Sequence, residues 1–458
     1  MDLSVVILAA GQGSRMCSKL PKVLHKVAHK PLLGHVIDVA ELLDAQDIHV
    51  VYGHGGEVVR DALSERKVSW VKQEEQLGTG HAVAQAVPDL IDNHIVLVLY
   101  GDVPLTTKET LQQLITQVSD TSMGLLTAVL DNPHGYGRIV RNSDNVVQRI
   151  TEEKDATDEI RKIREVNTGI LAASGGKLKE WLGRLKNDNA QGEYYLTDII
   201  AMAVHDGVVV NTSRATAVEE VEGINNRMQL ARLERYYQQQ QANQLMSAGV
   251  TMRDPARFDL RGTVETDIDV TIDANVVLEG NVVLGANVEI GANCVLINTV
   301  VGDGTVILPN SVIENAVIGA ACTIGPFARI RPDTVVADGA KIGNFVEVKK
   351  AQVGEGSKIN HLSYVGDSIV GKDVNIGAGV ITCNYDGASK HLTEIGDGAF
   401  IGSDSQLVAP VKIGAGATIG AGSTITCDAP ENALTLSRGK QRSVETWTRP
   451  QKKKRSKN

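Results

Sequence analysis

The sequence predicts two domains of different class, an α/β domain with a doubly wound, mostly parallel sheet and a solenoid of short strands. Three observations support this prediction. At 458 residues the chain is too long for one ordinary hydrophobic core. Its first half alternates apolar runs with amphipathic stretches, and its second half repeats an aliphatic residue about every six positions. We expect the α/β domain at 1–222, a helical linker at 223–250, the solenoid at 251–440 and a C-terminal segment with a basic tail at 441–458.

Strands and helices are expected to alternate along the first domain. Short apolar runs predict strands at 4–8, 48–52, 68–71, 95–100 and 124–130. Amphipathic stretches between them predict helices at 31–43, 57–64, 80–86 and 108–118. Such alternation is typical of a parallel sheet covered by helices. Residues 223–250 lack proline and are rich in helix formers, so we expect one exposed helix that joins the two domains.

From Ile272 to Ile425 an aliphatic residue recurs at a spacing that no helix produces. The interval is six residues, with four steps of five that end at Val301, Ile318, Val353 and Val370. A repeat of six suits a coil in which short strands are joined by tight turns and each strand buries one aliphatic side chain. Aromatic residues make up only 3% of the chain, which agrees with a core of stacked Ile, Val and Leu. Where the first turn begins, near 267–273, stays open.

Composition argues against several classes of function. The formal net charge of −9 disfavours general nucleic-acid binding. The five cysteines are scattered without a CxxC pair, which indicates reduced thiols and a cytoplasmic protein. The start lacks a basic region and no apolar stretch reaches the length of a membrane span, so we expect neither a signal peptide nor a transmembrane segment. We expect the basic tail to be a solubilising end, with membrane contact as the alternative.

A glycine-rich turn, LAAGQGSRM at 8–16, follows the first predicted strand. Such a turn lets backbone N–H groups approach a phosphate, and the helix that follows adds positive potential. The Walker A pattern is absent, and Met16 stands where a dinucleotide fingerprint has its third glycine. Arg15 and Lys22 place two cations beside this turn, which suits a triphosphate.

Further motifs make this domain resemble the sugar-nucleotide pyrophosphorylases, which join a sugar 1-phosphate to a nucleoside triphosphate and release pyrophosphate. The matching segments are LPKVL at 20–24, QLGTGH at 76–81, YGDVPL at 100–105, GYGR at 135–138, EEK at 152–154, NTG at 167–169 and EGINN at 222–226. With the hexapeptide repeat, the whole chain resembles the bacterial family of bifunctional N-acetylglucosamine-1-phosphate uridyltransferases and glucosamine-1-phosphate N-acetyltransferases. The resemblance implies a left-handed parallel β-helix, a homotrimer and acetyltransferase sites between chains.

Residue chemistry and the resemblance together define an expected nucleotide site. Asp102 ends an apolar strand, where α/β sheets place ligands, and its carboxylate suits Mg²⁺. The resemblance implies Asn225 as the second metal ligand. Arg15 and Lys22 would offset charge on the α-phosphate and the departing pyrophosphate, so no protein nucleophile is required. The residues expected to bind the UDP-sugar are Leu8, Ala9, Ala10, Gly11, Lys22, Gln73, Gly78, Thr79, Tyr100, Gly101, Asp102, Gly137, Glu152, Asn167 and Asn225.

Within that site the resemblance assigns the two ends of the product. Gln73, Gly78 and Thr79 are expected to read uracil. The N-acetylglucosamine part is expected on Gly137, Glu152 and Asn167. His81 follows the uridine segment and is expected to be structural.

The solenoid repeat breaks once, after Thr382, where residues 383–391 form a loop. Nearby polar residues favour a functional loop over a tolerated insertion. His361 is the expected catalytic base, because an imidazole titrates near neutrality and can take a proton from an attacking amine. Arg331 and Lys349 would clamp a sugar phosphate.

The resemblance completes the second site and its reaction. Sugar-contacting residues are expected to be Arg331, Lys349, Tyr364 and Asn375. Acetyl-coenzyme A is expected on Ala378, Asn384, Tyr385, Ser403, Ala421 and Arg438. The implied enzyme acetylates glucosamine 1-phosphate with acetyl-coenzyme A, then joins the product to UTP with Mg²⁺ to give UDP-N-acetylglucosamine for peptidoglycan synthesis. Two alternatives stay open: a monofunctional sugar-1-phosphate nucleotidyltransferase with a regulatory solenoid, and a solenoid that only forms trimers.

Overall fold

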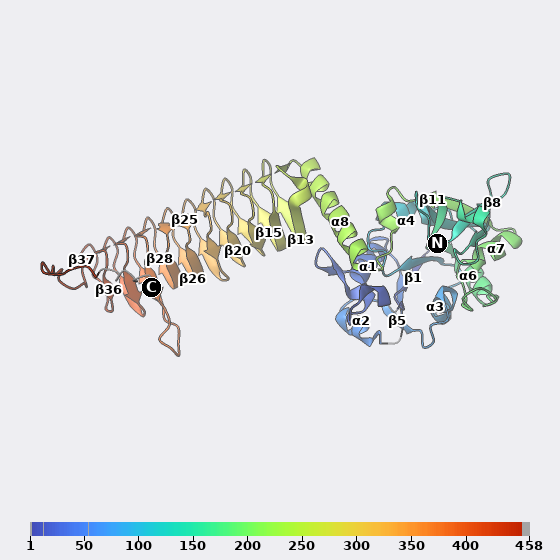
Figure 1. Ribbon diagram of the computed structural model, residues 1–458, viewed down its shortest axis with the longest axis horizontal. Coiled ribbons are helices and arrows are strands. Elements are labelled where there is room, and N and C mark those ends of the chain that lie inside the picture. The colour runs from blue at the N-terminus through green and yellow to red at the C-terminus, as the bar shows by residue number, and fades with distance from the viewer. Residues whose placement is uncertain (1, 12, 54, 451–458) are drawn as a thin grey trace, which may run out of the picture. The chain divides into compact units, whose positions relative to one another are not determined.

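The computed structural model describes residues 2–450 except 12 and 54. The basic tail beyond residue 450 lies outside the described residues. The chain divides into two compact units, Met1–Gln240 and Gln241–Asn458 (Figure 1). Across residues 2–450, with the same two gaps, no helix combines the length and apolarity needed to cross a bilayer.

The first unit is built on one sheet of strand order β11-β7-β10-β6-β1-β4-β5. Its strands are β1 (Leu3–Leu8), β4 (Asp47–Tyr52), β5 (Ser69–Lys72), β6 (Ile95–Tyr100), β7 (Ser122–Val129), β10 (Glu165–Ser174) and β11 (Val209–Arg214). Strands β6, β1, β4 and β5 are parallel, as predicted. Strand β10 runs antiparallel to both β6 and β7, which the sequence analysis did not anticipate. A hairpin of β8 (Arg138–Arg141) and β9 (Val147–Thr151) pairs beside β10 and was also missed.

Helices cover both faces of this sheet, because β1 alternates its buried side chains. Val5 and Ile7 pack with one core cluster, which includes α1, and Val6 and Leu8 pack with another, which includes α3. The helices of this unit are α1 (Leu32–Leu42), α2 (Glu57–Ala62), α3 (Thr79–Gln85), α4 (Lys108–Ile115), α5 (Asp158–Arg161), α6 (Gly175–Leu182) and α7 (Asp198–His205). The predicted doubly wound α/β arrangement is therefore confirmed.

The expected helix between the domains is α8 (Arg227–Ser247). It is less exposed than predicted. Leu233 is fully buried with Met16 and Leu32 in the first unit, and Ala242 is fully buried in the core of the second. The first part of α8 thus packs into a core of the first unit, and its last part packs into the core of the second unit.

The second unit is a coil of short parallel strands with three faces. The first face holds β12 (Thr251–Met252), β14 (Thr271–Ile272), β16 (Glu289–Ile290), β19 (Val306–Ile307), β22 (Thr323–Ile324), β25 (Lys341–Asn344), β27 (Lys358–His361), β29 (Asn375–Ile376), β32 (Phe400–Ile401), β35 (Thr418–Ile419) and β37 (Leu434–Thr435). The second face holds the start of β13 (Phe258–Thr266) and of β15 (Val276–Leu284), then β17 (Val295–Ile297), β20 (Val312–Glu314), β23 (Arg329–Ile330), the starts of β26 (Glu347–Val353) and β28 (Tyr364–Val370), β30 (Ile381–Cys383), β33 (Gln406–Val408) and β36 (Thr424–Ile425). The third holds the ends of β13, β15, β26 and β28 with β18 (Val300–Val301), β21 (Ala316–Ile318), β24 (Thr334–Val336), β31 (Thr393–Ile395) and β34 (Val411–Ile413).

The predicted aliphatic repeat is the core of this coil. Its residues from Ile272 to Ile425 point inward and are at most 3% exposed. We name the bend between the first and second faces the first corner, and the bend between the second and third faces the second corner. The four predicted steps of five residues all fall at the second corner. There Asn298, Asn315, Lys350 and Asp367 adopt φ of 45–46°, a left-handed conformation that closes the tighter turn.

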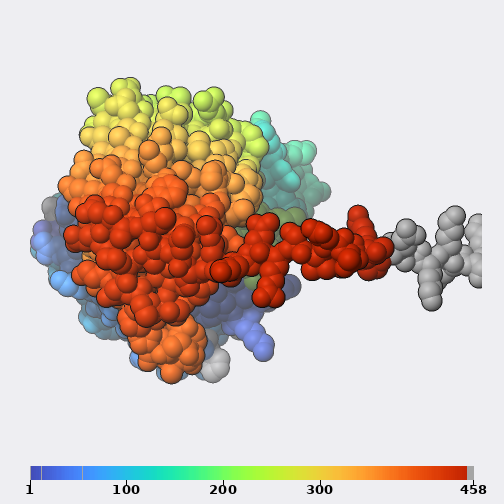
Figure 2. Space-filling model, turned by 90° about the vertical axis from the view of Figure 1, so that its left-hand side faces the viewer, coloured from blue at the N-terminus to red at the C-terminus, as the bar shows by residue number. Residues whose placement is uncertain are grey.

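The coil begins one turn before the predicted repeat. Met252 is paired with Ile272, and Leu260 with Leu278. At its other end, the residues that follow β37 leave the coil as an exposed arm, drawn in red in Figure 2. The one interruption, residues 384–391, emerges from the second corner and projects away from the coil in Figure 1.

Candidate functional site

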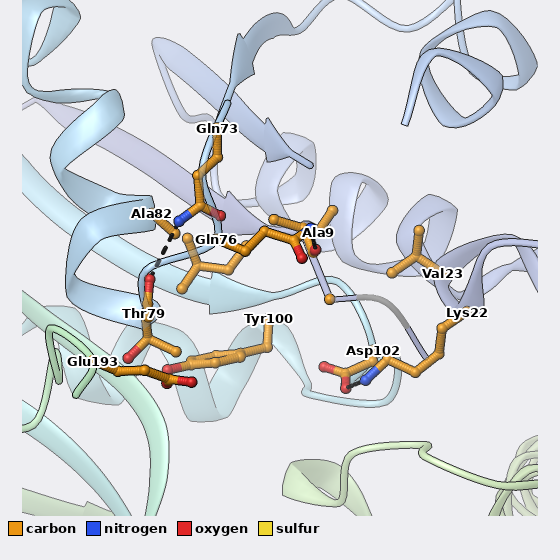
Figure 3. Close-up of a pocket in the computed structure, with 14 residues that line it drawn as sticks. Ala9, Lys22, Val23, Gln73, Gln76, Thr79, Ala82, Tyr100, Asp102 and Glu193 are labelled. Carbon is orange, nitrogen blue, oxygen red and sulfur yellow. Dashed lines mark hydrogen bonds and ion pairs between the residues drawn. The ribbon is translucent and has the colours of Figure 1, made fainter. Parts of the chain in front are cut away.

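A cavity of about 240 Å³ opens in the first unit at the carboxyl ends of β1 and β6 (Figure 3). Ten of the residues predicted to bind the UDP-sugar line it, namely Leu8, Ala9, Ala10, Gly11, Lys22, Gln73, Gly78, Thr79, Tyr100 and Asp102. Four further lining residues, Val23, Gln76, Ala82 and Glu193, were not anticipated. Gln76 lay within a quoted motif but received no role. Glu193 lies in a loop without a recognisable pattern.

One wall of the cavity carries a cluster of cations and oxygen ligands. Lys22 Nζ donates to Asp102 Oδ2 and, at 3.1 Å, to Asn225 Oδ1. Arg15 Nη2 donates to the same Asn225 oxygen at 3.0 Å. The Ile224 N–H, which bonds the Asp102 carbonyl at 2.9 Å, fixes the segment that carries Asn225 beside β6. The fold thus joins residues that lie 203 positions apart in the chain.

The oxygen atoms of this cluster fit a divalent cation. Asp102 Oδ2 and Asn225 Oδ1 converge on one cationic group, the Lys22 ammonium. Both are hard oxygen donors, the kind that Mg²⁺ prefers, and Mg²⁺ commonly takes only one or two protein ligands beside water and phosphate. No group of three or more His, Cys, Asp or Glu suited to a metal occurs among the described residues. A metal on this wall would therefore be held by this carboxylate and amide.

Gln73 and Gly78 form the opposite end of the cavity. Gln73 follows β5, is 2% exposed, and donates from Nε2 to the Gly78 carbonyl at 3.3 Å. Gly78 has φ of 111°, and a Cβ there would lie 2.7 Å from the Tyr194 carbonyl oxygen, so this turn requires glycine. Gln76 Nε2 donates to the Ala10 carbonyl at 2.8 Å and ties this segment to the glycine-rich turn.

Gly137, Glu152 and Asn167 were also predicted but do not line the cavity, and they lie close to one another. The Asn167 N–H bonds the Gly137 carbonyl at 2.8 Å, and Thr197 Oγ1 donates to Glu152 Oε1 at 2.9 Å. Burial raises the pKa of Glu152 and also that of Tyr100. The predicted Gly101 does not line the cavity, and its N–H bonds the Leu8 carbonyl at 2.9 Å.

His361 lies on the exposed surface at the end of β27 in the second unit. Its Nδ1 is 2.9 Å from Asn344 Oδ1 on the preceding turn. An amide oxygen only accepts hydrogen bonds, so Nδ1 carries the hydrogen and Nε2 keeps its lone pair. Among the residues that the structure describes, the basic nitrogen of the predicted base has no hydrogen-bond partner. The sequence analysis missed Asn344, whose only signal is its place one turn before His361.

Cationic side chains lie on consecutive turns of the second face. The Arg331 N–H bonds the Val348 carbonyl, which places Arg331 beside Lys349, and Arg331 Nη1 donates to Glu347 Oε1 at 2.8 Å. The ammonium of Lys390 lies beside Lys349 and lowers its pKa. Lys390 belongs to the loop at 384–391, and the sequence analysis did not single it out. Two adjacent ammonium groups favour an anion between them.

The root of the loop is tied to the same face. Asn384 Nδ2 donates to Asp367 Oδ2 at 2.6 Å and to Tyr364 Oη at 3.3 Å. The phenol of Tyr364 lies across Gly366, where any Cβ would collide with its oxygen. Within the loop, Asp386 accepts from the Ser389 N–H at 2.7 Å and lies 2.7 Å from His391 Nε2.

The residues predicted to bind acetyl-coenzyme A lie mostly along the first corner. Ala378, Ser403 and Ala421 each lie two positions after an inward aliphatic residue of the first face, on three consecutive turns. Arg438 extends this column, because its Nη1 donates to the Ala421 carbonyl at 3.0 Å. Asn375 lies in β29 on the first face, whereas Tyr385 is exposed on the loop.

Comparison with known proteins finds the same two components. Residues 5–173 match the MobA-like NTP transferase domain, residues 260–339 match the GMPPB C-terminal domain, and residues 392–427 match the bacterial transferase hexapeptide (six repeats). The bifunctional protein GlmU of Marinobacter nauticus is 60% identical over 450 residues, which are 98% of this chain and 99% of its own. The bifunctional protein GlmU of Methylococcus capsulatus is 58% identical over 453 residues, which are 99% of this chain and 98% of its own.

Identity at this level extends over nearly the whole of each chain and so covers both units. The chain therefore belongs to the bifunctional GlmU family, the N-acetylglucosamine-1-phosphate uridyltransferases and glucosamine-1-phosphate N-acetyltransferases that its motifs predict.

Proposed function

We propose that the two units perform consecutive transfers at separate sites. The coil acetylates the amino group of glucosamine 1-phosphate with acetyl-coenzyme A. The α/β unit then transfers UMP from UTP to the product, giving UDP-N-acetylglucosamine for peptidoglycan synthesis, and pyrophosphate. One observation carries this proposal: the Lys22–Asp102–Asn225 cluster and the His361–Asn344 pair lie on different units of one chain.

In uridylyl transfer, a phosphate oxygen of the sugar attacks the α-phosphorus of UTP, and the bond to pyrophosphate breaks. Positioning and charge stabilisation are the main demands of this step. Lys22 and Arg15 are the cations on the cavity wall, and they would hold the phosphate oxygens as negative charge moves to the leaving group. Backbone N–H groups of the glycine-rich turn would orient the triphosphate.

We assign Mg²⁺ to Asp102 and Asn225, whose side-chain oxygens converge on one cation. When bound, Mg²⁺ neutralises phosphate charge. Lys22 would then release these two oxygens and turn its ammonium to the substrate.

In acetyl transfer, His361 Nε2 would take a proton as the sugar nitrogen attacks the thioester carbonyl. The new C–N bond forms, the C–S bond breaks, and coenzyme A leaves as a thiolate that is then protonated. Asn344 holds the ring in the tautomer that this step needs. Lys349, Lys390 and Arg331 would bind the sugar phosphate.

We propose that the coil forms a homotrimer. The left-handed residues at the first corner are Asn275, Asn293 and Asn310 on early turns but Phe327, Phe345 and Leu362 on later ones. These three apolar side chains are 48%, 56% and 63% exposed, and the two phenyl rings stack at 5.2 Å. A row of apolar side chains on consecutive turns suits burial against another copy of the coil.

We also propose a cytoplasmic location. All five cysteines are free thiols, including the exposed Cys17 and Cys427, which supports a reducing compartment.

Two variants test the separation of the sites. In His361→Ala, we expect no release of coenzyme A from acetyl-coenzyme A and glucosamine 1-phosphate, with pyrophosphate release from UTP and the acetylated sugar unchanged. Asp102→Ala is expected to do the opposite. Equal loss of both activities in either folded variant would refute two separate sites. Pyrophosphate release that persists undiminished in EDTA would overturn the metal assignment.

A further inference from the structure

His81 contacts the side chain of Gln73, the residue expected to read the base. It lies in the first turn of α3, and its Nδ1 is 3.0 Å from Gln73 Nε2. The same Gln73 nitrogen donates to the Gly78 carbonyl at 3.3 Å. A side-chain amide has two N–H hydrogens. Both are therefore used, one on each of these acceptors.

The remaining polar atom of Gln73 is its carbonyl oxygen. In Figure 3 the Gln73 nitrogen points toward the start of α3, and the oxygen points the other way, toward Gln76 and the cavity. Within residues 2–450, apart from 12 and 54, Gln73 Oε1 accepts no hydrogen bond. Gln73 Oε1 is thus an unused hydrogen-bond acceptor that faces the cavity.

An acceptor distinguishes the two pyrimidines of common nucleotides. The N3 of uracil carries a hydrogen, whereas the N3 of cytosine is itself an acceptor and would repel Gln73 Oε1. If the amide were turned over, its NH₂ group would favour cytosine instead. The orientation of one amide therefore decides between the bases.

We propose that His81 is a positioning residue for base selection: with the Gly78 carbonyl, it holds the Gln73 amide so that Oε1 selects a base with an N3–H. The inference rests on the proposed uridylyl transfer and adds to it the origin of nucleotide specificity. It also replaces the structural role that the sequence analysis gave to His81.

The role requires a defined tautomer of His81. Nδ1 must accept from Gln73, so the ring hydrogen is on Nε2. Nε2 lies 3.1 Å from the side-chain amide of Gln85, one turn along α3. Turning that amide over would present its oxygen to Nε2–H and would give up the bond that Gln85 Nε2 donates to the His81 carbonyl at 3.1 Å. The tautomer therefore requires the Gln85 amide in the turned orientation.

The test compares kcat/KM for UTP and CTP with N-acetylglucosamine 1-phosphate as the second substrate. His81→Phe keeps an aromatic ring near Tyr194, whose ring centroid is 6.3 Å away, but removes the acceptor. We expect the UTP:CTP ratio to fall about tenfold, the worth of one hydrogen bond, with the change in the KM of the nucleotide. The KM of the sugar phosphate should not change. His81→Gln, which restores an acceptor, should recover much of the ratio.

His35→Phe is the matched control. His35 is also a partly buried histidine of this unit, but it lies on α1 and its Nε2 bonds the Val27 carbonyl at 3.0 Å. This variant should keep the wild-type ratio. A wild-type UTP:CTP ratio in folded His81→Phe would overturn the inference, because it would show that His81 acts only through the packing of its ring. A wild-type protein that forms no UDP-N-acetylglucosamine would instead refute the proposed function.

Discussion

Between Ile272 and Ile425, Thr382 occupies the one inward position where the aliphatic repeat is broken, and we predict that its hydroxyl is required there. The strand on the preceding turn, β28, pairs with β30 only at Tyr364 and Ile381, because the chain then leaves the coil for the loop at 384–391. At the gap, Thr382 Oγ1 accepts from the Gly366 N–H at 2.8 Å and donates to the Gly366 carbonyl at 3.1 Å. The side chain replaces two ladder bonds. Thr382→Val keeps the shape and removes both.

The expected loss follows from these contacts. A buried group left without its partner costs about 1–3 kcal/mol. We assign about 2 kcal/mol to the N–H and about 1 kcal/mol to the carbonyl, which keeps its bond from Ser368 Oγ at 2.8 Å. The added methyl group returns about 0.8 kcal/mol. The net destabilisation is about 2 kcal/mol, close to a thirtyfold change in an opening equilibrium.

Hydrogen exchange at the Gly366 amide is the direct assay, since a two-unit chain has no single unfolding free energy. Exchange should become about thirtyfold faster in Thr382→Val. Thr393→Val is the control, because Thr393 is also fully buried in the coil and its Oγ1 has no partner among the described residues. That variant should be neutral or more stable. Equal effects of the two substitutions, or unchanged exchange at Gly366, would refute the reasoning.

Three further predictions concern the two sites and the assembly. Asn344→Leu frees the His361 ring, so kcat for acetyl transfer should fall about 10- to 100-fold with an unchanged KM for acetyl-coenzyme A, as measured by thiol release; an unchanged kcat would contradict the tautomer argument. Burial raises the pKa of Glu152 above its unfolded value, so the stability that it contributes is present below the unfolded pKa and is lost as pH rises through the native pKa. Denaturant midpoints of Glu152→Gln should therefore exceed those of the wild type at high pH and converge with them at low pH, and a gap that widened on acidification would reverse the sign. Phe345→Asp should dissociate the proposed trimer in light scattering, whereas Leu42→Asp, at another exposed apolar position, should not.

The inward face of the coil was predictable because each turn repeats one physical requirement. Val348 and Val365 are buried for the same reason as Ile272, and a period of six reveals them all. The first turn was not predicted because Thr266, which pairs with Leu284, interrupts the aliphatic pattern. The inward residues of a regular coil can thus be predicted from sequence, whereas the turns at its ends cannot.

Contacts between distant segments were less accessible. The glycine-rich turn and Asp102 could be placed at one sheet edge from strand order alone. Thr197, which bonds Glu152, lies in a segment with no motif. The pairing of Lys390 with Lys349 depends on where the loop folds back, which no periodicity encodes. Such residues become visible only when the backbone is known.

Consecutive turns of a coil are spaced by the backbone ladder, at about 4.8 Å. Arg331, Lys349 and Gly366 share one register across three turns, so their separations are multiples of a fixed increment. A helix or a loop can drift by a fraction of an ångström when its packing changes, but this scaffold admits only whole steps. A change of substrate length would therefore call for a longer or shorter side chain, or for a different loop at a corner, and not for a gradual shift of the backbone.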